Sequence, residues 1–173
     1  MPASEWGCAD WVVIIKIKIK MKKIIEISEK EIGYKENPNN SNKTKYGKWF
    51  GFDGVAWCAI FVSWVYYKAG FPLGNIGFKK GFAGCQTAVA HFKKTKQTTT
   101  TPVSGDIVFF DWNGDGRFDH TGIFVKDING LKFETIEGNT SLTNQSNGGE
   151  VMRRKRNYKN VLFVHPIVCD AVS

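Results

Sequence analysis

Residues 57–69, WCAIFVSWVYYKA, decide the fold class, because they form a helix that is apolar nearly all round. A helix of this kind is normally buried at the centre of a domain. Gly70 follows the stretch and Pro72 comes soon after, which is the usual way for a helix to end. The sequence therefore predicts one central helix, and Cys58 lies at its beginning.

The order of the other elements predicts an α+β fold. Short helices are expected over residues 24–33 and 83–94, whereas residues 46–56 look irregular and residues 96–102, KQTTTTP, look like a linker. The expected strands are apolar runs bounded by Gly, Asn or Asp, namely 107–110, 121–125, 131–137, 150–158 and 160–168. Helices followed by a run of strands favour N-terminal helices packed on an antiparallel sheet.

Length and composition exclude several classes of protein. The chain has 173 residues, which suits one domain. Its longest unbroken run of large aliphatic or aromatic residues, residues 11–15, is far shorter than the roughly 18 residues of a membrane span. No internal repeat is present, and the four cysteines lack zinc-site spacing. We therefore expect a monomer without a membrane span or a structural zinc ion.

The net charge of +8 favours a polyanionic partner. Ten of the 24 Lys and Arg residues lie in two short groups, which are Lys79, Lys80, Lys93, Lys94 and Lys96, and Arg153, Arg154, Lys155, Arg156 and Lys159. Each group can also be a solvated face. Because no nucleic-acid-binding motif accompanies the charge, we expect no nucleic-acid partner.

Residues 1–20, MPASEWGCADWVVIIKIKIK, differ from the sequence that follows. Lysines come after the apolar run, which is the reverse of the order in a secretory signal. The alternation of isoleucine and lysine over residues 15–20 has a period of two, which suits a strand with one lysine-covered face. The alternative, which we favour, is an added or mis-started leader, because Met21 would make a natural start. The predicted organisation is an atypical N-terminal extension or leader over residues 1–20 and one domain over residues 21–173.

Cys58 is a candidate nucleophile because it opens the central helix. The N-terminus of a helix carries about half a positive charge and free N–H groups, which stabilise the reactive thiolate form of cysteine. The same N–H groups can form part of an oxyanion hole. The alternative is a buried, inert cysteine. Cys85 also lies near a helix start, but no acid–base pair accompanies it in the sequence, and we interpret it as a core residue.

A thiolate nucleophile needs a base, and His120 is the best candidate of the three histidines. His120 lies in the turn before an expected strand, whereas His91 lies among surface lysines and His165 looks structural. Glu137 and Asn139 follow on the next expected strand, where residues two apart share a face. Either side chain can orient an imidazole ring.

Three blocks of this sequence resemble the CHAP domain, the cysteine, histidine-dependent amidohydrolase/peptidase. They are KYGKWFGFDGVAWCAIFVSWVYYKAGFP from residue 45, PVSGDIVFFDWNGDGRFDHTGIFV from residue 102, and TIEGN from residue 135. The resemblance runs from about residue 24 to residue 166 and implies a papain-like α+β fold. It also implies that Cys58 is the nucleophile, His120 the base, Glu137 the residue that orients His120, and Asn139 a supporting polar group.

The resemblance implies hydrolysis of amide bonds in the peptide part of peptidoglycan, by an N-acetylmuramoyl-L-alanine amidase or an endopeptidase. Such enzymes occur in phage endolysins and bacterial autolysins. We expect a bacteriolytic phage endolysin that stays in the host cytoplasm until release and then degrades the cell wall. One alternative is a non-catalytic, basic module that binds the cell wall. Another is a cysteine amidase that acts on a small amide, because fold alone does not settle the substrate.

The segment DWNGDGRFDH, residues 111–120, matches the opening D-x-[DN]-x-[DN]-G of a calcium loop. The predicted ligands are Asp111, Asn113, Asp115, Arg117 (through its carbonyl) and Asp119. The alternative is an Asp/Asn/Gly hairpin, which uses the same residue types. Some CHAP enzymes carry a calcium site near the active centre, and the resemblance is consistent with such a site here. The calcium ion would be structural, because the expected chemistry itself requires no cofactor.

Overall fold

The computed structural model describes residues 8–145 and 147–168, with side chains from residue 18 onward. Its helices are α1 (Cys8–Glu29), α2 (Lys45–Phe50), α3 (Cys58–Lys68) and α4 (Cys85–Lys94). Its strands are β1 (Thr98–Thr99), β2 (Ile107–Phe110), β3 (His120–Asp127), β4 (Lys132–Thr140), β5 (Glu150–Asn157) and β6 (Val161–Val164). The five strands expected between residues 107 and 168 are all present, and the predicted α+β class is confirmed.

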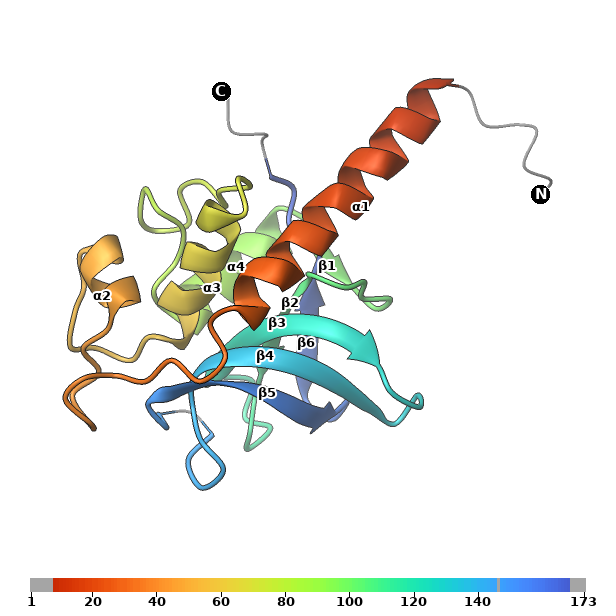
Figure 1. Cartoon of the computed structure of the whole chain (residues 1–173). Helices are drawn as coiled ribbons and strands as arrows, with labels where there is room; N and C mark the ends of the chain where they lie inside the picture. Colours follow the sequence, from red (N-terminus) through yellow and green to blue (C-terminus); the bar gives the residue numbers. More distant parts are fainter. Residues whose placement is uncertain (1–7, 146, 169–173) are drawn as a thin grey trace.

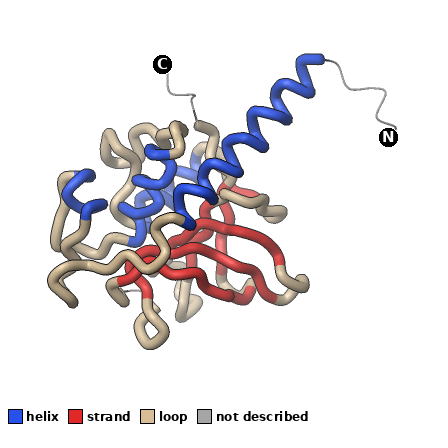
Figure 2. Tube along the Cα trace, in the orientation of Figure 1, coloured by secondary structure: helices blue, strands red, loops and turns tan. Residues whose placement is uncertain are grey.

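The strands form one antiparallel sheet in the order β1-β6-β2-β3-β4-β5. Figure 1 shows α2, α3 and α4 grouped beside this sheet, while α1 runs diagonally past them. Figure 2 shows the same separation of helices and strands. Of these strands, β3 and β4 make the closest contact with α3.

α3 is the central helix that its composition predicts. Every residue from Cys58 to Tyr66 is buried. Close contact with the sheet depends on Gly138 of β4, because a Cβ atom there would lie 2.7 Å from the side chain of Phe61 and 2.8 Å from that of Trp57. The missing side chain lets β4 approach α3, which brings the end of β4 towards the start of the helix.

Both faces of the sheet are covered by apolar side chains. Ile107, Phe109, Ile123 and Ile136 belong to the large core around α3. A second cluster on the opposite face contains Val108, Phe110, Phe124, Phe133 and Phe163. Because side chains alternate along a strand, His120 and Glu137 lie on the face of this second cluster.

The strand, which was one of two interpretations of residues 15–20, is wrong. α1 is one continuous helix from Cys8 to Glu29, so the predicted boundary between residues 20 and 21 falls inside it, while residues 1–7 lie outside the described residues. An alternation over six residues does not prevent a neighbouring helix from extending through them. Each further helical residue adds a hydrogen bond without a new nucleation cost. The buried Ile24 and a hydrogen bond from Lys20 to the carbonyl of Pro166 (2.8 Å) fix the C-terminal half of α1 to the domain.

Two short elements were not expected from the sequence. α2 forms within the stretch interpreted as irregular, and Thr44 caps it by accepting a hydrogen bond from the N–H of Gly47 (2.9 Å). β1 forms within the expected linker and pairs with β6 at the edge of the sheet. Among residues 8–145 and 147–168, no helix combines the length and the apolar character needed to cross a membrane.

Candidate active site

Cys58 is the first residue of α3 and lines an open pocket. Its side chain is buried, with 6% of the residue exposed. The preceding residue, Trp57, makes no side-chain cap hydrogen bond, so the N–H groups of the first turn are not covered by a capping side chain. The pocket is lined by Ala56, Cys58, Ala83, Gly84, Cys85, Gln86, Thr87, Phe118 and Asp119. A carbonyl group in this pocket would therefore meet both a thiol and helix N–H donors.

His120 and Glu137 form a fully buried pair behind this thiol. The Nε2 atom of His120 lies 3.0 Å from Oε2 of Glu137, and both side chains are completely buried. The other ring nitrogen of His120, Nδ1, makes no hydrogen bond of ordinary geometry within the described residues, although it is buried too. Because Nε2 is held by Glu137, Nδ1 is the nitrogen that is left to serve Cys58.

The pKa shifts in this cluster favour a thiolate–imidazolium pair. The pKa of Cys58 is lowered well below its usual value, first by a hydrogen bond from Cys85 and then by His120, against the opposing effect of burial. Burial alone would lower the pKa of His120, but Cys58 and Glu137 together raise it to about 9. Each group thus stabilises the charged form of the other, as an active cysteine requires.

Arg156 of β5 holds the carboxylate of Glu137 in place. Its Nε donates to Oε1 of Glu137 (2.8 Å), and its Nη2 donates to Oε2. Thr135 adds a hydrogen bond from its hydroxyl to Oε1 (2.6 Å). Burial alone would raise the pKa of Glu137, but the hydrogen bonds from Arg156 and His120 lower it to about 2. Glu137 is therefore ionised and fixed in direction where it meets His120.

The family model of the CHAP domain matches this chain over residues 49–139. The match covers more than half of the chain and includes Cys58, His120, Glu137 and Asn139. The chain belongs to the CHAP domain family. Membership implies a cysteine- and histidine-dependent amidase or peptidase, and the helices followed by an antiparallel sheet are consistent with the CHAP fold. No curated protein matches the sequence.

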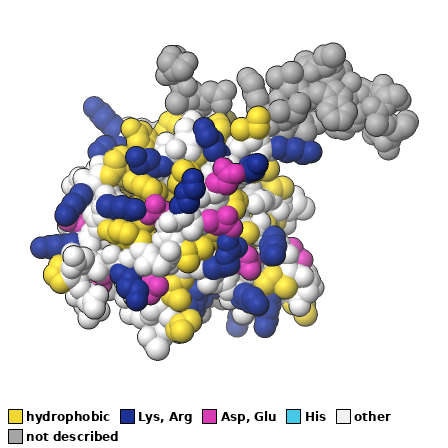
Figure 3. Space-filling view, viewed as in Figure 1, with side chains coloured by type: hydrophobic (Ala, Val, Ile, Leu, Met, Phe, Trp, Pro, Cys, Tyr) yellow, Lys and Arg dark blue, Asp and Glu magenta, His cyan; other side chains and the backbone are white. Residues whose placement is uncertain are grey.

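Arg156 lies outside the residues that match the CHAP model, and the interpretation of its basic group as a uniform solvated face is wrong for this residue. Only 7% of Arg156 is exposed, whereas Arg153 in the same group is exposed and pairs with Glu29 and Glu134. Figure 3 shows Lys and Arg side chains spread over one face of the molecule, with acidic side chains among them. Within the sequence, a run of basic residues gives no sign that one of them points inward.

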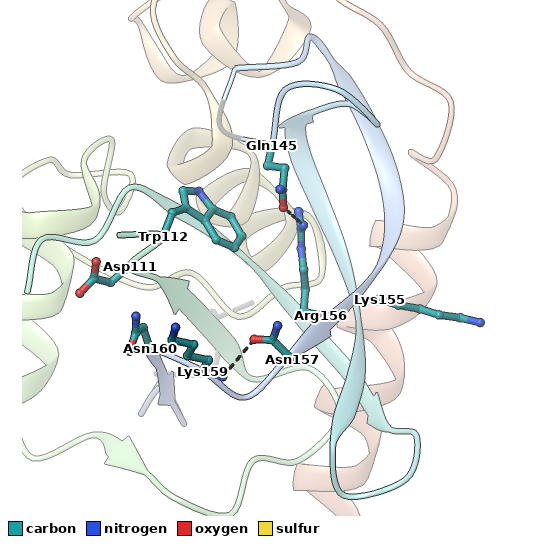
Figure 4. Close-up of a pocket in the computed structure, with 8 residues that line it drawn as sticks. All are labelled: Asp111, Trp112, Gln145, Lys155, Arg156, Asn157, Lys159 and Asn160. Atoms are coloured by element: carbon teal, nitrogen blue, oxygen red, sulfur yellow. Dashed lines mark hydrogen bonds between the residues drawn. The ribbon is translucent and has the colours of Figure 1, made fainter. Parts of the chain in front are cut away.

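Aromatic rings complete the surroundings of His120 in this CHAP domain. The ring of Trp112 lies 6.0 Å from that of His120, and the guanidinium of Arg156 lies 4.9 Å from the centre of the Trp112 ring. Figure 4 shows Trp112 and Arg156 at a second pocket, where Gln145 accepts a hydrogen bond from Arg156 and Lys155 points away. This pocket is lined by Asp111, Trp112, Gln145, Lys155, Arg156, Asn157, Lys159 and Asn160, and thus adjoins Arg156 rather than Cys58.

Asn139 is buried at the end of β4, where it holds the loop that leads to β5. Its Nδ2 donates to Asn147 (3.0 Å), and its Oδ1 accepts from the N–H of Gly149 (3.3 Å). Asn139 has a positive φ of 58°, and the register of β4 with β5 shifts between Glu137 and Thr140. The side chain of Asn139 therefore turns towards the loop, and its supporting role in catalysis stays a prediction.

In the loop of predicted calcium ligands, aspartate side chains accept hydrogen bonds from backbone N–H groups of the same loop. Asp111 accepts hydrogen bonds from the N–H groups of Gly114 (2.7 Å), Asp115 (3.2 Å) and Gly116 (2.8 Å). Asp119 accepts from the N–H of Trp112 (2.9 Å). No group of three or more His, Cys, Asp or Glu side chains in the described part of the chain is placed to hold a metal ion. The calcium site stays a prediction, and we route no catalytic step through a metal.

Of the two other residues that the sequence analysis assigned to the structure of the protein, His165 keeps that role and Cys85 does not. His165 lies away from the thiol, with its Nδ1 2.7 Å from a carboxylate oxygen of Asp106, in keeping with a structural role. Cys85, interpreted as a core residue, instead lines the same pocket as Cys58. The sequence contained one sign of this, since both cysteines are at helix starts, but only the packing of α4 beside α3 brings the two starts to one pocket.

Proposed function

We propose that this protein is a peptidoglycan hydrolase in which Cys58 is the nucleophile, His120 the acid–base catalyst and Glu137 the residue that orients His120. The observation that carries the proposal is the buried chain from His120 through Glu137 to Arg156, next to a cysteine at a helix N-terminus. A protein that only binds the cell wall has no use for a thiol with a lowered pKa.

The reaction begins with a peptide carbonyl in the pocket that Cys58 lines. The Cys58 thiolate attacks the carbonyl carbon, and the negative charge that develops on the oxygen is stabilised by N–H groups at the start of α3, including that of Cys58. His120 then donates a proton from Nδ1 to the leaving amine, and the C–N bond breaks. The acyl group is now bound to Cys58 as a thioester.

Hydrolysis of the thioester completes the cycle. His120, now neutral, removes a proton from a water molecule, and the resulting hydroxide attacks the thioester carbonyl. The acid product leaves, and Cys58 returns to the thiolate. Glu137 keeps Nε2 of His120 protonated and its ring in a fixed orientation through both steps, because Glu137 is itself held by Arg156 and Thr135.

The test uses purified Gram-positive cell walls with the wild type, Cys58→Ala, and a Cys8→Ala/Cys169→Ala control that changes cysteines outside the CHAP match. We expect the wild type and the control to lower turbidity and release amino groups, and Cys58→Ala to do neither. Mass spectrometry of the new termini then distinguishes an amidase from an endopeptidase.

Two outcomes would overturn the proposal. If no variant releases amines but all sediment with the walls, the protein is a wall-binding module. If walls are neither cut nor bound while small amides are hydrolysed with Cys58 intact, the protein is an amidase for small substrates.

We further propose a phage endolysin that acts from inside the host cell. Expression in the cytoplasm of a susceptible bacterium should cause lysis only after the membrane is permeabilised, because the wall lies outside the membrane. Lysis without permeabilisation would argue against this route.

A further inference from the structure

Two helices of this protein begin with a cysteine, and both beginnings open on one pocket. Cys58 is the first residue of α3 and Cys85 the first residue of α4. Both line the pocket that also contains Gly84 and Phe118, and neither is in a disulfide. In the proposed hydrolysis Cys85 only helps to stabilise the Cys58 thiolate, and no step forms or breaks a bond to the sulfur of Cys85.

The two thiols line one pocket, and each shifts the pKa of the other. A hydrogen bond between them is the largest cause of the lowered pKa of Cys58, and it is also the largest cause of the raised pKa of Cys85. These opposite shifts favour a thiolate at Cys58 and a protonated thiol at Cys85. Only 9% of Cys85 is exposed, and that part faces the pocket in which Cys58 would react.

We propose that Cys58 and Cys85 are a reversible oxidation site for hydroperoxides. The Cys58 thiolate attacks one oxygen of the peroxide, the O–O bond breaks, and Cys58 becomes a sulfenic acid. The other oxygen takes a proton from His120 and leaves as water or an alcohol. The sulfur of Cys85 then attacks the sulfur of Cys58, an S–S bond forms, the S–OH bond breaks, and water leaves with the Cys85 proton. The two thiols together lose two electrons, which the peroxide takes up.

Oxidation would switch off hydrolysis, because the disulfide blocks the Cys58 nucleophile. This consequence rests on the proposed function. A neighbouring thiol captures the sulfenic acid before further peroxide can convert it to sulfinic acid, which most thiols cannot reduce. A dithiol would open the disulfide by exchange and restore the Cys58 thiolate. Cys85 would then protect the enzyme, which would pause under oxidation and recover afterwards.

The test uses a Cys8→Ser/Cys169→Ser background, so that only Cys58 and Cys85 can react. After treatment with hydrogen peroxide, we expect a mass lower by two hydrogen atoms and a cross-linked peptide that contains both cysteines. Dithiothreitol should restore the original mass and the activity on cell walls. With Cys85→Ala added, peroxide should instead leave Cys58 as sulfinic or sulfonic acid, and dithiothreitol should restore little activity.

The mass readout does not depend on hydrolysis, so it tests this inference even if the proposed function fails. Cys85→Ser is a second variant in case Cys85→Ala folds poorly, and its fold is checked by circular dichroism. The inference is overturned if peroxide oxidises Cys58 without a Cys58–Cys85 cross-link. It is also overturned if the variants without Cys85 recover the same fraction of their own untreated activity as the background protein does.

Discussion

The side chain of Glu137 crosses the space that a side chain at Gly122 would fill. A Cβ atom at Gly122 would lie 2.6 Å from Cγ of Glu137 and 3.2 Å from the carbonyl oxygen of Ile136. Gly122 is two residues after His120 on β3 and shares its face of the sheet. Because Gly122 has no side chain, the carboxylate of Glu137 on β4 has room to reach the imidazole of His120 on β3.

Gly122→Ala should lower activity more than it lowers stability. The added methyl group displaces Glu137, which cannot simply swing away because Arg156 and Thr135 hold it. Overpacking of this kind costs about 1–3 kcal/mol in the free energy of unfolding. Urea unfolding and turbidity assays measure the two effects. If the loss of activity acts through Glu137, the same change should cost much less activity in a Glu137→Gln background.

Arg156→Met should both destabilise the protein and lower its activity. It leaves the fully buried Glu137 carboxylate without its main partner, and breaking such a pair costs roughly 3–5 kcal/mol. A carboxylate that no longer fixes His120 should lower kcat, on the order of 10²-fold for a misplacement of 1 Å. Lys155→Met is the matched control, because Lys155 is the exposed neighbour on the same strand and points away from the pocket. Equal effects of the two substitutions would contradict the role given to Arg156.

The pH profile of kcat/KM should have an alkaline limb near pH 9. Activity needs the Cys58 thiolate and the protonated His120, and the pKa of His120 is raised to about 9. Activity should therefore rise as the pH passes the lowered pKa of Cys58 and fall as His120 loses its proton. Glu137→Gln removes a charge that raises the pKa of His120, so the alkaline limb should move to lower pH. An alkaline limb that stays in place would show that Glu137 does not set this pKa.

Stability should decrease in acid partly through Glu137. Its pKa falls from 4.5 to about 2 on folding, so its contribution is complete above about pH 4.5 and is lost as the pH falls towards 2. The shift corresponds to roughly 3 kcal/mol. Urea unfolding at several pH values measures it, and Glu137→Gln should show a smaller loss of unfolding free energy over that range. Parallel curves for the two proteins would exclude Glu137 as the source.

Calcium dependence of the loop over residues 111–120 is open to a direct test. According to the sequence-based prediction, thorough chelation lowers activity and added calcium restores it, because the ion would stiffen the loop that precedes His120. The side chains instead bond to the loop backbone in this structure. Melting temperatures of the wild type and Asp115→Ala, each measured with chelator and with calcium, distinguish a calcium-bound loop from a loop held by its own hydrogen bonds. An unchanged melting temperature and activity after chelation would contradict the calcium prediction.

The sequence predicted the elements that depend on local patterns. The buried helix from Cys58 and the strand over residues 107–110 follow from runs of apolar residues, and their punctuation by glycine, proline and aspartate sets their ends. The same patterns placed Cys58, His120 and Glu137 at the ends of their predicted elements. The strand over residues 15–20 failed because a short alternation has no meaning without a partner strand.

Face assignments along the strands were only partly predictable. Alternation puts Glu137 on the face of His120, and the structure agrees. The same rule puts Asn139 beside Glu137, but the register shift and the positive φ at Asn139 turn that side chain towards the loop. An irregularity of this kind breaks the period of two, and only the paired strands reveal it.

The sequence by itself therefore determined the fold class, the family blocks and the candidate nucleophile, base and orienting carboxylate, because these follow from local periodicity and short motifs. The tertiary structure alone decided that Arg156 is buried against Glu137 and that Cys85 meets Cys58. Both relationships join residues far apart in the chain. Local preference cannot specify such contacts, since they depend on how strands pair and on where two helix ends converge.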